Sequence, residues 1–105
     1  MSFKQVNLDN INIKYKEYKS VNAEKTLVIL HGWNVNGIQS WEKFLDKLTK
    51  SKPNYNWIAI DMPGFGGSDL PNGVWGPDEY SDFIHKLLTV KLKLNQINLI
   101  VHSFG

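Results

Sequence analysis

Three short apolar runs, none of them long enough for a helix, constrain the fold of this 105-residue chain more than any other feature. They lie at residues 26–30, 57–60 and 97–101. Apolar runs of this length with little polar alternation are typical of strands that are covered on both faces, as in a parallel sheet. Each run ends abruptly, at His31, Asp61 or His102. The runs therefore predict buried parallel strands with a polar loop at each carboxyl end.

Two amphipathic segments separate these runs. In the first, Ile38, Trp41, Leu45 and Leu48 share one helical face and predict a helix over about residues 40–49. In the second, Tyr80, Phe83, Ile84, Leu87 and Leu88 recur at helical spacing after a cap at Gly76 or Asp78. Val90, Leu92 and Leu94 alternate like a strand, but the turn at residues 95–96 makes them a helix end. The order strand, helix, strand, helix, strand predicts a βαβαβ unit.

The first eighteen residues predict an antiparallel hairpin. Two partly alternating apolar segments, at residues 3–8 and 11–18, meet at the turn-forming pair Asp9 and Asn10. The predicted fold class is therefore α/β, with an amino-terminal hairpin and a mostly parallel sheet with flanking helices. Ligands of such sheets gather at the carboxyl ends of the strands, so the loops at 31–37, 61–77 and 102–105 share one candidate site. Trp33 and Trp75 either line an apolar pocket there or only pack.

The last loop places a serine where a strand stops. Val101, His102, Ser103, Phe104 and Gly105 match the pattern G-x-S-x-G except that valine replaces the first glycine and adds bulk at a tight backbone crossing. In that pattern the serine takes a strained conformation and its hydroxyl is raised above the sheet. The alternative interpretation of S-x-G alone is a helix N-cap serine followed by a packing glycine.

Four features together resemble the first half of an α/β-hydrolase. They are the sequence LHGW at residues 30–33, Trp41 on the next helix, DMPGFGGSD at residues 61–69 and the Ser103 bend. The resemblance implies a sheet ordered 1-2-4-3-5, with three further strands missing. It also implies that Ser103 is the nucleophile and that the backbone N–H groups of Trp33 and Phe104 form the oxyanion hole. Gly32 would let that backbone approach.

The resemblance also limits the chemistry. Serine at the bend, in place of the aspartate of the dehalogenase and epoxide-hydrolase branches, implies acyl-group chemistry. The expected partner is a small-molecule acyl substrate, either an ester, a thioester, an amide or a carbon–carbon bond beside a ketone. In this family the acid and the histidine of the triad follow the serine along the chain, which puts both beyond residue 105. We therefore expect residues 1–105 to be the amino-terminal part of a single α/β-hydrolase domain, incomplete at the C-terminus and ending at the nucleophile elbow.

Without its base, a serine stays a weak nucleophile, so we expect no appreciable hydrolase activity from these residues alone. An apolar edge strand at 97–101 would also make the isolated chain prone to aggregation. The alternative hypothesis is a non-catalytic binding or receptor-like module, or a degenerate stub, on the same scaffold. Val101 and the missing triad partners favour that alternative.

Other conspicuous residues have structural interpretations. His31 is expected to bond nearby backbone, His102 to point away from Ser103, and His85 to be solvated on its helix. Asp61 is expected to fix its loop through Asx-type bonds to backbone. The glycines at residues 64–67 form a turn, because the spacing of a phosphate-binding loop is absent.

Composition excludes several classes of function. The chain has 12 basic residues against 10 acidic ones, a net charge of +2, and all of the basic residues are lysine. No arginine and no dense basic run are present, so a nucleic-acid partner is not expected. Cysteine is absent, which removes disulfides and thiolate metal sites, and no metal or cofactor is expected.

The opening residues lack the apolar stretch of a signal peptide, and no run is long enough for a membrane, so a cytoplasmic location is predicted. The oligomeric state is not indicated.

Overall fold

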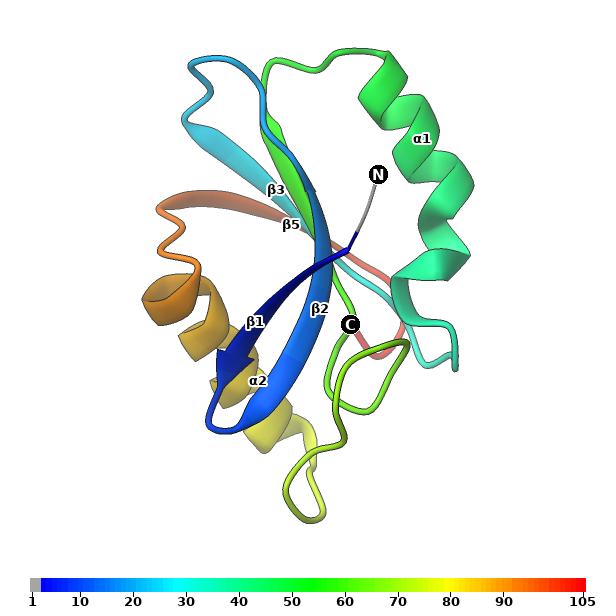
Figure 1. Cartoon of the computed structure of the whole chain (residues 1–105), viewed down its shortest axis with the longest axis vertical. Coiled ribbons are helices and arrows are strands. Elements are labelled where there is room, and N and C mark those ends of the chain that lie inside the picture. Colours follow the sequence, from blue (N-terminus) through cyan, green and yellow to red (C-terminus); the bar gives the residue numbers. More distant parts are fainter. Residues whose placement is uncertain (1–2) are drawn as a thin grey trace.

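The computed structural model describes residues 3–105, and its centre is a five-stranded mixed sheet (Figure 1). The strands are β1 (Lys4–Leu8), β2 (Ile11–Tyr18), β3 (Lys25–Leu30), β4 (Asn56–Ile60) and β5 (Gln96–Val101). Their order is β1-β2-β4-β3-β5, as the resemblance implied. Strands β4, β3 and β5 run parallel, whereas β2 is antiparallel to both β1 and β4. The predicted α/β class, with hairpin and mostly parallel sheet, is confirmed.

The hairpin turn follows from its two central residues. Asp9 and Asn10 have φ angles of 52° and 64°, the left-handed pair that suits the twist of a tight hairpin. Aspartate and asparagine tolerate this conformation better than other residues with a Cβ atom. The turn sets the register so that Leu8 lies opposite Ile11 and both are buried.

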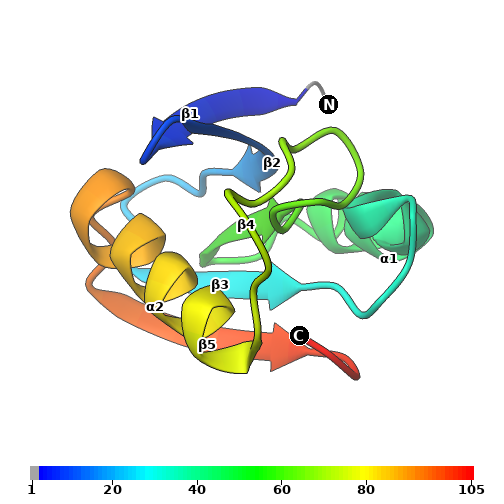
Figure 2. The same ribbon diagram turned by 90° about the horizontal axis from the view of Figure 1, so that it is seen from below.

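Strand β3 is central, as its unbroken apolar run predicted. Its residues Val28 and Ile29 are completely buried and belong to two different core clusters. Val28 packs in the cluster that contains Phe83 and Leu87, and Ile29 in the cluster that contains Leu45. Successive residues of a strand point to opposite faces, so the two clusters fill the two sides of the sheet. Helices α1 and α2 accordingly lie on opposite sides of it (Figure 2).

The helices differ from prediction mainly at their ends. A 3₁₀ turn, Gly37–Trp41, precedes α1 (Glu42–Lys50), so the α-helix begins two residues later than expected. Helix α2 (Pro77–Lys86) has Gly76 as its N-cap, and the Gly76 N–H donates to Glu79 Oε1 at 2.5 Å.

A π-helical turn, Leu87–Lys91, continues α2. Beyond it, the Leu92 and Leu94 N–H groups donate to the carbonyls of Leu87 and Leu88, both at 2.9 Å. The alternating residues before β5 are thus a helix end, as predicted. Within residues 3–105, no helix combines the length and apolar character that crossing a membrane requires.

Strand β5 is the outer strand on its side of the sheet. Within the described residues it pairs with β3 alone. Ile97, Leu99 and Val101 lie on one face of β5, and their exposed fractions are 36%, 53% and 50%. An apolar outer strand is therefore present where the sequence predicted one.

Candidate active site

The three unusual loops begin at the same level of the sheet. In the parallel register Leu30 lies opposite both Ile60 and Val101, the last residues of β4 and β5. His31, Asp61 and His102 follow these three residues directly. The loops after β3, β4 and β5 therefore meet at one carboxyl edge, which confirms the arrangement predicted from the strand order.

Ser103 lies in a sharp turn directly after β5. Its φ angle is +55°, in the left-handed region that is costly for any residue with a Cβ atom. The Gly105 N–H closes the turn by donating to the His102 carbonyl at 3.0 Å. Ser103 is exposed, so this backbone presents its hydroxyl at the surface above the end of β5.

Two glycines let backbone segments pass close to this turn. A Cβ atom on Gly105 would lie 2.6 Å from the Leu30 carbonyl oxygen and 2.7 Å from that of His31, both of them backbone atoms. A Cβ atom on Gly32 would lie 3.2 Å from the Ser103 Cβ. Glycine is thus required where the β3 loop crosses the Ser103 turn. Val101, which takes the place of the first motif glycine, is half exposed.

His31 connects two of the loops. The ring is fully buried, with Nδ1 2.7 Å from the Gly32 carbonyl oxygen and Nε2 accepting the Met62 N–H at 3.0 Å. These partners fix the neutral tautomer that carries its proton on Nδ1. Burial lowers the pKa of His31, although the Gly32 carbonyl and Asp61 favour the charged ring. With both ring nitrogens bonded to backbone, His31 has the structural role that was predicted.

Asp61 is the second buried connection. Its Oδ1 accepts the Ile38 N–H at 2.8 Å and its Oδ2 accepts the Gly67 N–H at 3.0 Å. Gly37 and Gly66 press so closely on the carboxylate that a Cβ atom on either would collide with its oxygens. The carboxylate therefore fixes loop backbone, as predicted, and it reaches the β3 loop as well as its own.

Aromatic rings bring the two candidate oxyanion-hole residues together. The rings of Trp33 and Phe104 meet edge to face at 5.2 Å between centroids, and Phe65 packs against both. Tyr80 adds an edge-to-face contact with Phe104 at 5.0 Å. Trp33 follows β3 and Phe104 follows Ser103, so residues about seventy positions apart become neighbours.

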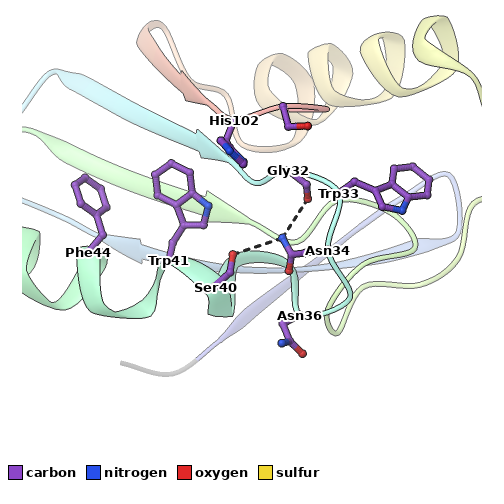
Figure 3. Close-up of a pocket in the computed structure, with 9 residues that line it drawn as sticks. Gly32, Trp33, Asn34, Asn36, Ser40, Trp41, Phe44 and His102 are labelled. Atoms are coloured by element: carbon purple, nitrogen blue, oxygen red, sulfur yellow. Dashed lines mark hydrogen bonds between the residues drawn. The ribbon is translucent and has the colours of Figure 1, made fainter.

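A cavity of about 650 Å³ opens beside the Ser103 turn (Figure 3). Its lining residues are Gly32, Trp33, Asn34, Asn36, Ser40, Trp41, Phe44, His102 and Ser103. Three of the lining residues, Trp33, Trp41 and Phe44, are aromatic, which suits an apolar portion of a ligand. Trp33 therefore lines a pocket, whereas Trp75 packs against Tyr80 and Phe83. Of the two alternatives, lining a pocket thus holds for Trp33 and packing holds for Trp75.

The remaining histidines have no partner at this site. His102 lines the cavity together with Ser103, but no hydrogen bond joins the two side chains within residues 3–105. His85 is exposed on α2. The described residues also contain no group of three or more acidic, histidine or cysteine side chains that could hold a metal ion.

Sequence reasoning missed Asn34. Its side-chain amide donates to the Gly32 carbonyl at 3.2 Å and to Ser40 Oγ at 3.5 Å (Figure 3). The available signal was the loop sequence at residues 33–36, in which two asparagines follow the expected oxyanion-hole residue. Nothing in that pattern distinguishes a buried amide from a solvated one.

Comparison with known proteins agrees with this geometry. The family model for the alpha/beta hydrolase fold matches residues 25–105. A probable lysophospholipase of Arabidopsis thaliana, BODYGUARD 2, is 30% identical over 103 residues, which are 94% of this chain and 22% of that protein. A putative non-heme chloroperoxidase of Synechocystis sp. is 34% identical over 88 residues, or 84% of this chain and 30% of that protein.

A solved structure of a membrane phospholipase A, described as a bacterial virulence factor, superposes with a TM-score of 0.80 and 27% identity. The match covers 99% of this chain and 32% of that one. The chain thus spans between about a fifth and a third of the length of these similar proteins. The family match takes in β3, β4, β5 and all three loops. The chain belongs to the α/β-hydrolase fold family.

Proposed function

We propose that the protein carrying this chain is a serine hydrolase that cleaves an acyl bond of a small-molecule substrate, with Ser103 as the nucleophile. The observation that carries the proposal is the φ angle of +55° at Ser103, directly after β5 and on the wall of the cavity. Strain of this kind at an exposed serine is the backbone signature of a nucleophile elbow. A helix N-cap serine, the alternative interpretation, has φ in the extended region instead.

The proposed oxyanion hole uses backbone N–H groups of Trp33 and Phe104. Support comes from the close approach of Gly32 to the Ser103 turn and from the contact between the Trp33 and Phe104 rings. Each such donor stabilises the transition state by about 2.7 to 4 kcal/mol, because negative charge appears on the carbonyl oxygen only during attack. Donors that are already in place require no reorganisation when that charge develops.

We propose that the general base comes from another part of the protein, since no hydrogen bond joins His102 to Ser103 within the described residues. His31 is committed to backbone through both ring nitrogens, and His85 lies on α2 away from the cavity lining. In this fold the acid and the histidine follow the serine along the chain. We therefore propose that residues 1–105 are the amino-terminal part of one hydrolase domain and that they lack appreciable activity alone.

The substrate class is an ester, a thioester, an amide or a carbon–carbon bond beside a ketone. Two of the similar proteins are named as a lysophospholipase and a phospholipase A, which favours an ester. The aromatic lining from Trp33, Trp41 and Phe44 suits an apolar acyl portion. The cytoplasmic location expected from the sequence stays a prediction that cell fractionation would test.

A fluorophosphonate probe tests the proposal against the alternative, a non-catalytic binding module on the same scaffold. The probe labels a serine only where a base and an oxyanion hole activate it. We expect the chain as its gene encodes it, with any residues that follow Gly105, to be labelled at Ser103 and the Ser103→Ala variant to be unlabelled. Ser51→Ala is the control and should stay labelled, since Ser51 is exposed at the end of α1 and does not line the cavity. Complete absence of labelling in that chain would favour the binding module.

A further inference from the structure

The Gly32 carbonyl oxygen accepts two hydrogen bonds from side chains of its own loop. One comes from His31 Nδ1 at 2.7 Å and the other from Asn34 Nδ2 at 3.2 Å. A carbonyl oxygen has two lone pairs, so these two donors occupy both. The carbonyl of Gly32 and the N–H of Trp33 belong to one planar trans peptide and point in opposite directions. Fixing the carbonyl therefore fixes the direction of the Trp33 N–H.

The orientation of the Asn34 amide is determined by its neighbours. Ser40 Oγ donates its proton to the Gly37 carbonyl at 2.9 Å, so it can only accept from Asn34. The Gly32 carbonyl can also only accept. Both positions require the NH₂ end of the amide, and a flipped Asn34 would set oxygen against oxygen twice.

This placement leaves the other end of the amide without a partner. Asn34 Oδ1 is buried and accepts no hydrogen bond from any residue of the described chain. A buried acceptor without a partner costs free energy and is uncommon in native structures. Such costs concentrate at functional sites, where the surrounding structure holds a side chain in place. The Asn34 amide thus keeps its hydrogen bond to the Gly32 carbonyl, and its own Oδ1 is left without a partner.

We propose that Asn34 is a positioning residue that, with His31, holds the Gly32–Trp33 peptide so that the Trp33 N–H points at the oxygen of the acyl group attacked by Ser103. The inference rests on the proposed function and adds a residue to it. Gly32 packs directly against the Ser103 turn, so a rotation of this one peptide would move the Trp33 N–H away from the reacting carbonyl. Asn34 itself does not touch the substrate in this role.

Two substitutions at Asn34 separate the effect of its donated hydrogen bonds from the effect of its side-chain packing. Asn34→Asp keeps the size of the side chain and replaces the donor with a carboxylate that repels the Gly32 carbonyl, whereas Asn34→Ala removes the side chain. If donation matters, the aspartate variant is affected at least as strongly as the alanine variant. If only packing matters, the aspartate variant is the milder one. Asn54→Ala is the control, because Asn54 is an exposed asparagine that does not line the cavity.

The first readout is structural and needs no activity. Residual dipolar couplings report the direction of each backbone N–H in the complete chain as its gene encodes it. We expect the Trp33 coupling to change in both Asn34 variants while the couplings of β3, β4 and β5 stay as in the wild type. We expect Asn54→Ala to leave the Trp33 coupling unchanged. In the wild type, the Asn34 side-chain NH₂ protons exchange slowly with water.

The second readout is the rate at which a fluorophosphonate labels Ser103. In that reaction the Ser103 Oγ bonds to phosphorus, the phosphorus–fluorine bond breaks, and fluoride leaves while the base takes the hydroxyl proton. The phosphoryl oxygen occupies the oxyanion hole, so a misdirected Trp33 N–H slows the step. We expect at least about a tenfold lower rate in Asn34→Asp, which corresponds to about 1.4 kcal/mol, and an unchanged rate in Asn54→Ala.

Two results would overturn the inference about Asn34. One is an unchanged Trp33 coupling in the folded aspartate variant, and the other is a smaller effect for aspartate than for alanine. If neither variant folds, the Asn34 NH₂ protons of the wild type provide the test: exchange as fast as in a free amide overturns the inference, and slow exchange supports it. Absence of labelling in the wild type would instead count against the proposed function, and the couplings would still decide whether Asn34 directs the Trp33 N–H.

Discussion

Asp61 Oδ1 accepts a 2.8 Å hydrogen bond from the backbone N–H of Ile38, a residue 23 positions earlier in the chain. The other oxygen of the same carboxylate holds the Gly67 N–H at 3.0 Å. One buried side chain, 1% exposed, thereby joins the loop that carries Trp33 to the loop after β4. The carboxylate is suited to this because it offers acceptors on both sides and no donor.

The first prediction concerns this pair of bonds. Asn in place of Asp61 keeps the shape but turns one acceptor into an NH₂ group that faces a backbone N–H. Hydrogen bonds to charged groups are worth about 1.5 to 3 kcal/mol, so Asp61→Asn is expected to lower the free energy of unfolding by about that amount. Urea unfolding followed by tryptophan fluorescence measures the loss. Asp46→Asn, on the exposed surface of α1, is the control, and an equal effect of the two substitutions would contradict this role of Asp61.

The second prediction uses two glycines with positive φ. Gly66 has φ +54° and a Cβ atom there would collide with the Asp61 carboxylate, whereas Gly73 has φ +94° and open space around it. Alanine at either position carries a backbone cost of about 1 to 2 kcal/mol. At Gly66, but not at Gly73, the collision with the Asp61 carboxylate destabilises the folded chain by about a further 1 to 3 kcal/mol. Gly66→Ala is thus expected to unfold at clearly lower urea than Gly73→Ala, and equal midpoints would show that the carboxylate contact is unimportant.

The sequence predicted the sheet well because strand identity depends on local pattern. Strands β3, β4 and β5 follow from short apolar runs, and the antiparallel hairpin from the pair Asp9 and Asn10. Parallel strands place their carboxyl ends together, so the meeting of three loops was predictable too. The order of β4 and β3 came from the family resemblance, since hydrophobic pattern alone does not say which buried strand lies next to which.

Contacts across the loops could not be predicted. The bond between Asp61 and Ile38, the amide of Asn34 and the tight approach of Gly32 to Ser103 all depend on how the loops fold against one another. Each requires side-chain and backbone positions to within a fraction of an ångström, which residue type and spacing do not specify. The 3₁₀ turn that delays α1 is a local feature, but Trp41 fits the helical face in either case, so periodicity did not reveal it.

The third prediction is a pH dependence of stability that originates at His31. Burial lowers the pKa of the folded ring below its ordinary value of 6.5, so the unfolded chain binds more protons than the folded one near that pH. Stability is therefore full above 6.5 and is lost as the pH falls through 6.5 towards the lower folded pKa. Protonation would also set Nε2–H against the Met62 N–H, which it now accepts.

Unfolding free energies at about pH 7.5 and about pH 5.5 test this origin. The slope from one proton is at most about 1.4 kcal/mol per pH unit, and His31→Gln is expected to remove that part of it. The wild type should also be less stable at the lower pH. His85→Gln, at an exposed position on α2, is the control and should keep the wild-type slope. A wild-type slope that survives in His31→Gln would place the titrating group elsewhere.

The last prediction separates stability from function at Ser103. Its φ of +55° is readily adopted by glycine and costs about 1 to 2 kcal/mol for a residue with a Cβ atom. Ser103→Gly is expected to be more stable than Ser103→Ala by about 1 kcal/mol, because glycine also gives the unfolded chain extra freedom and offsets part of the gain. Lys52, exposed with φ +50°, provides the reference pair Lys52→Gly and Lys52→Ala at a site far from the cavity lining. Similar differences at the two sites would show that Ser103 keeps its left-handed backbone in the folded protein, as the proposed elbow requires. An alanine variant at 103 as stable as the glycine variant would show that the turn relaxes, and the geometric support for the elbow would be lost.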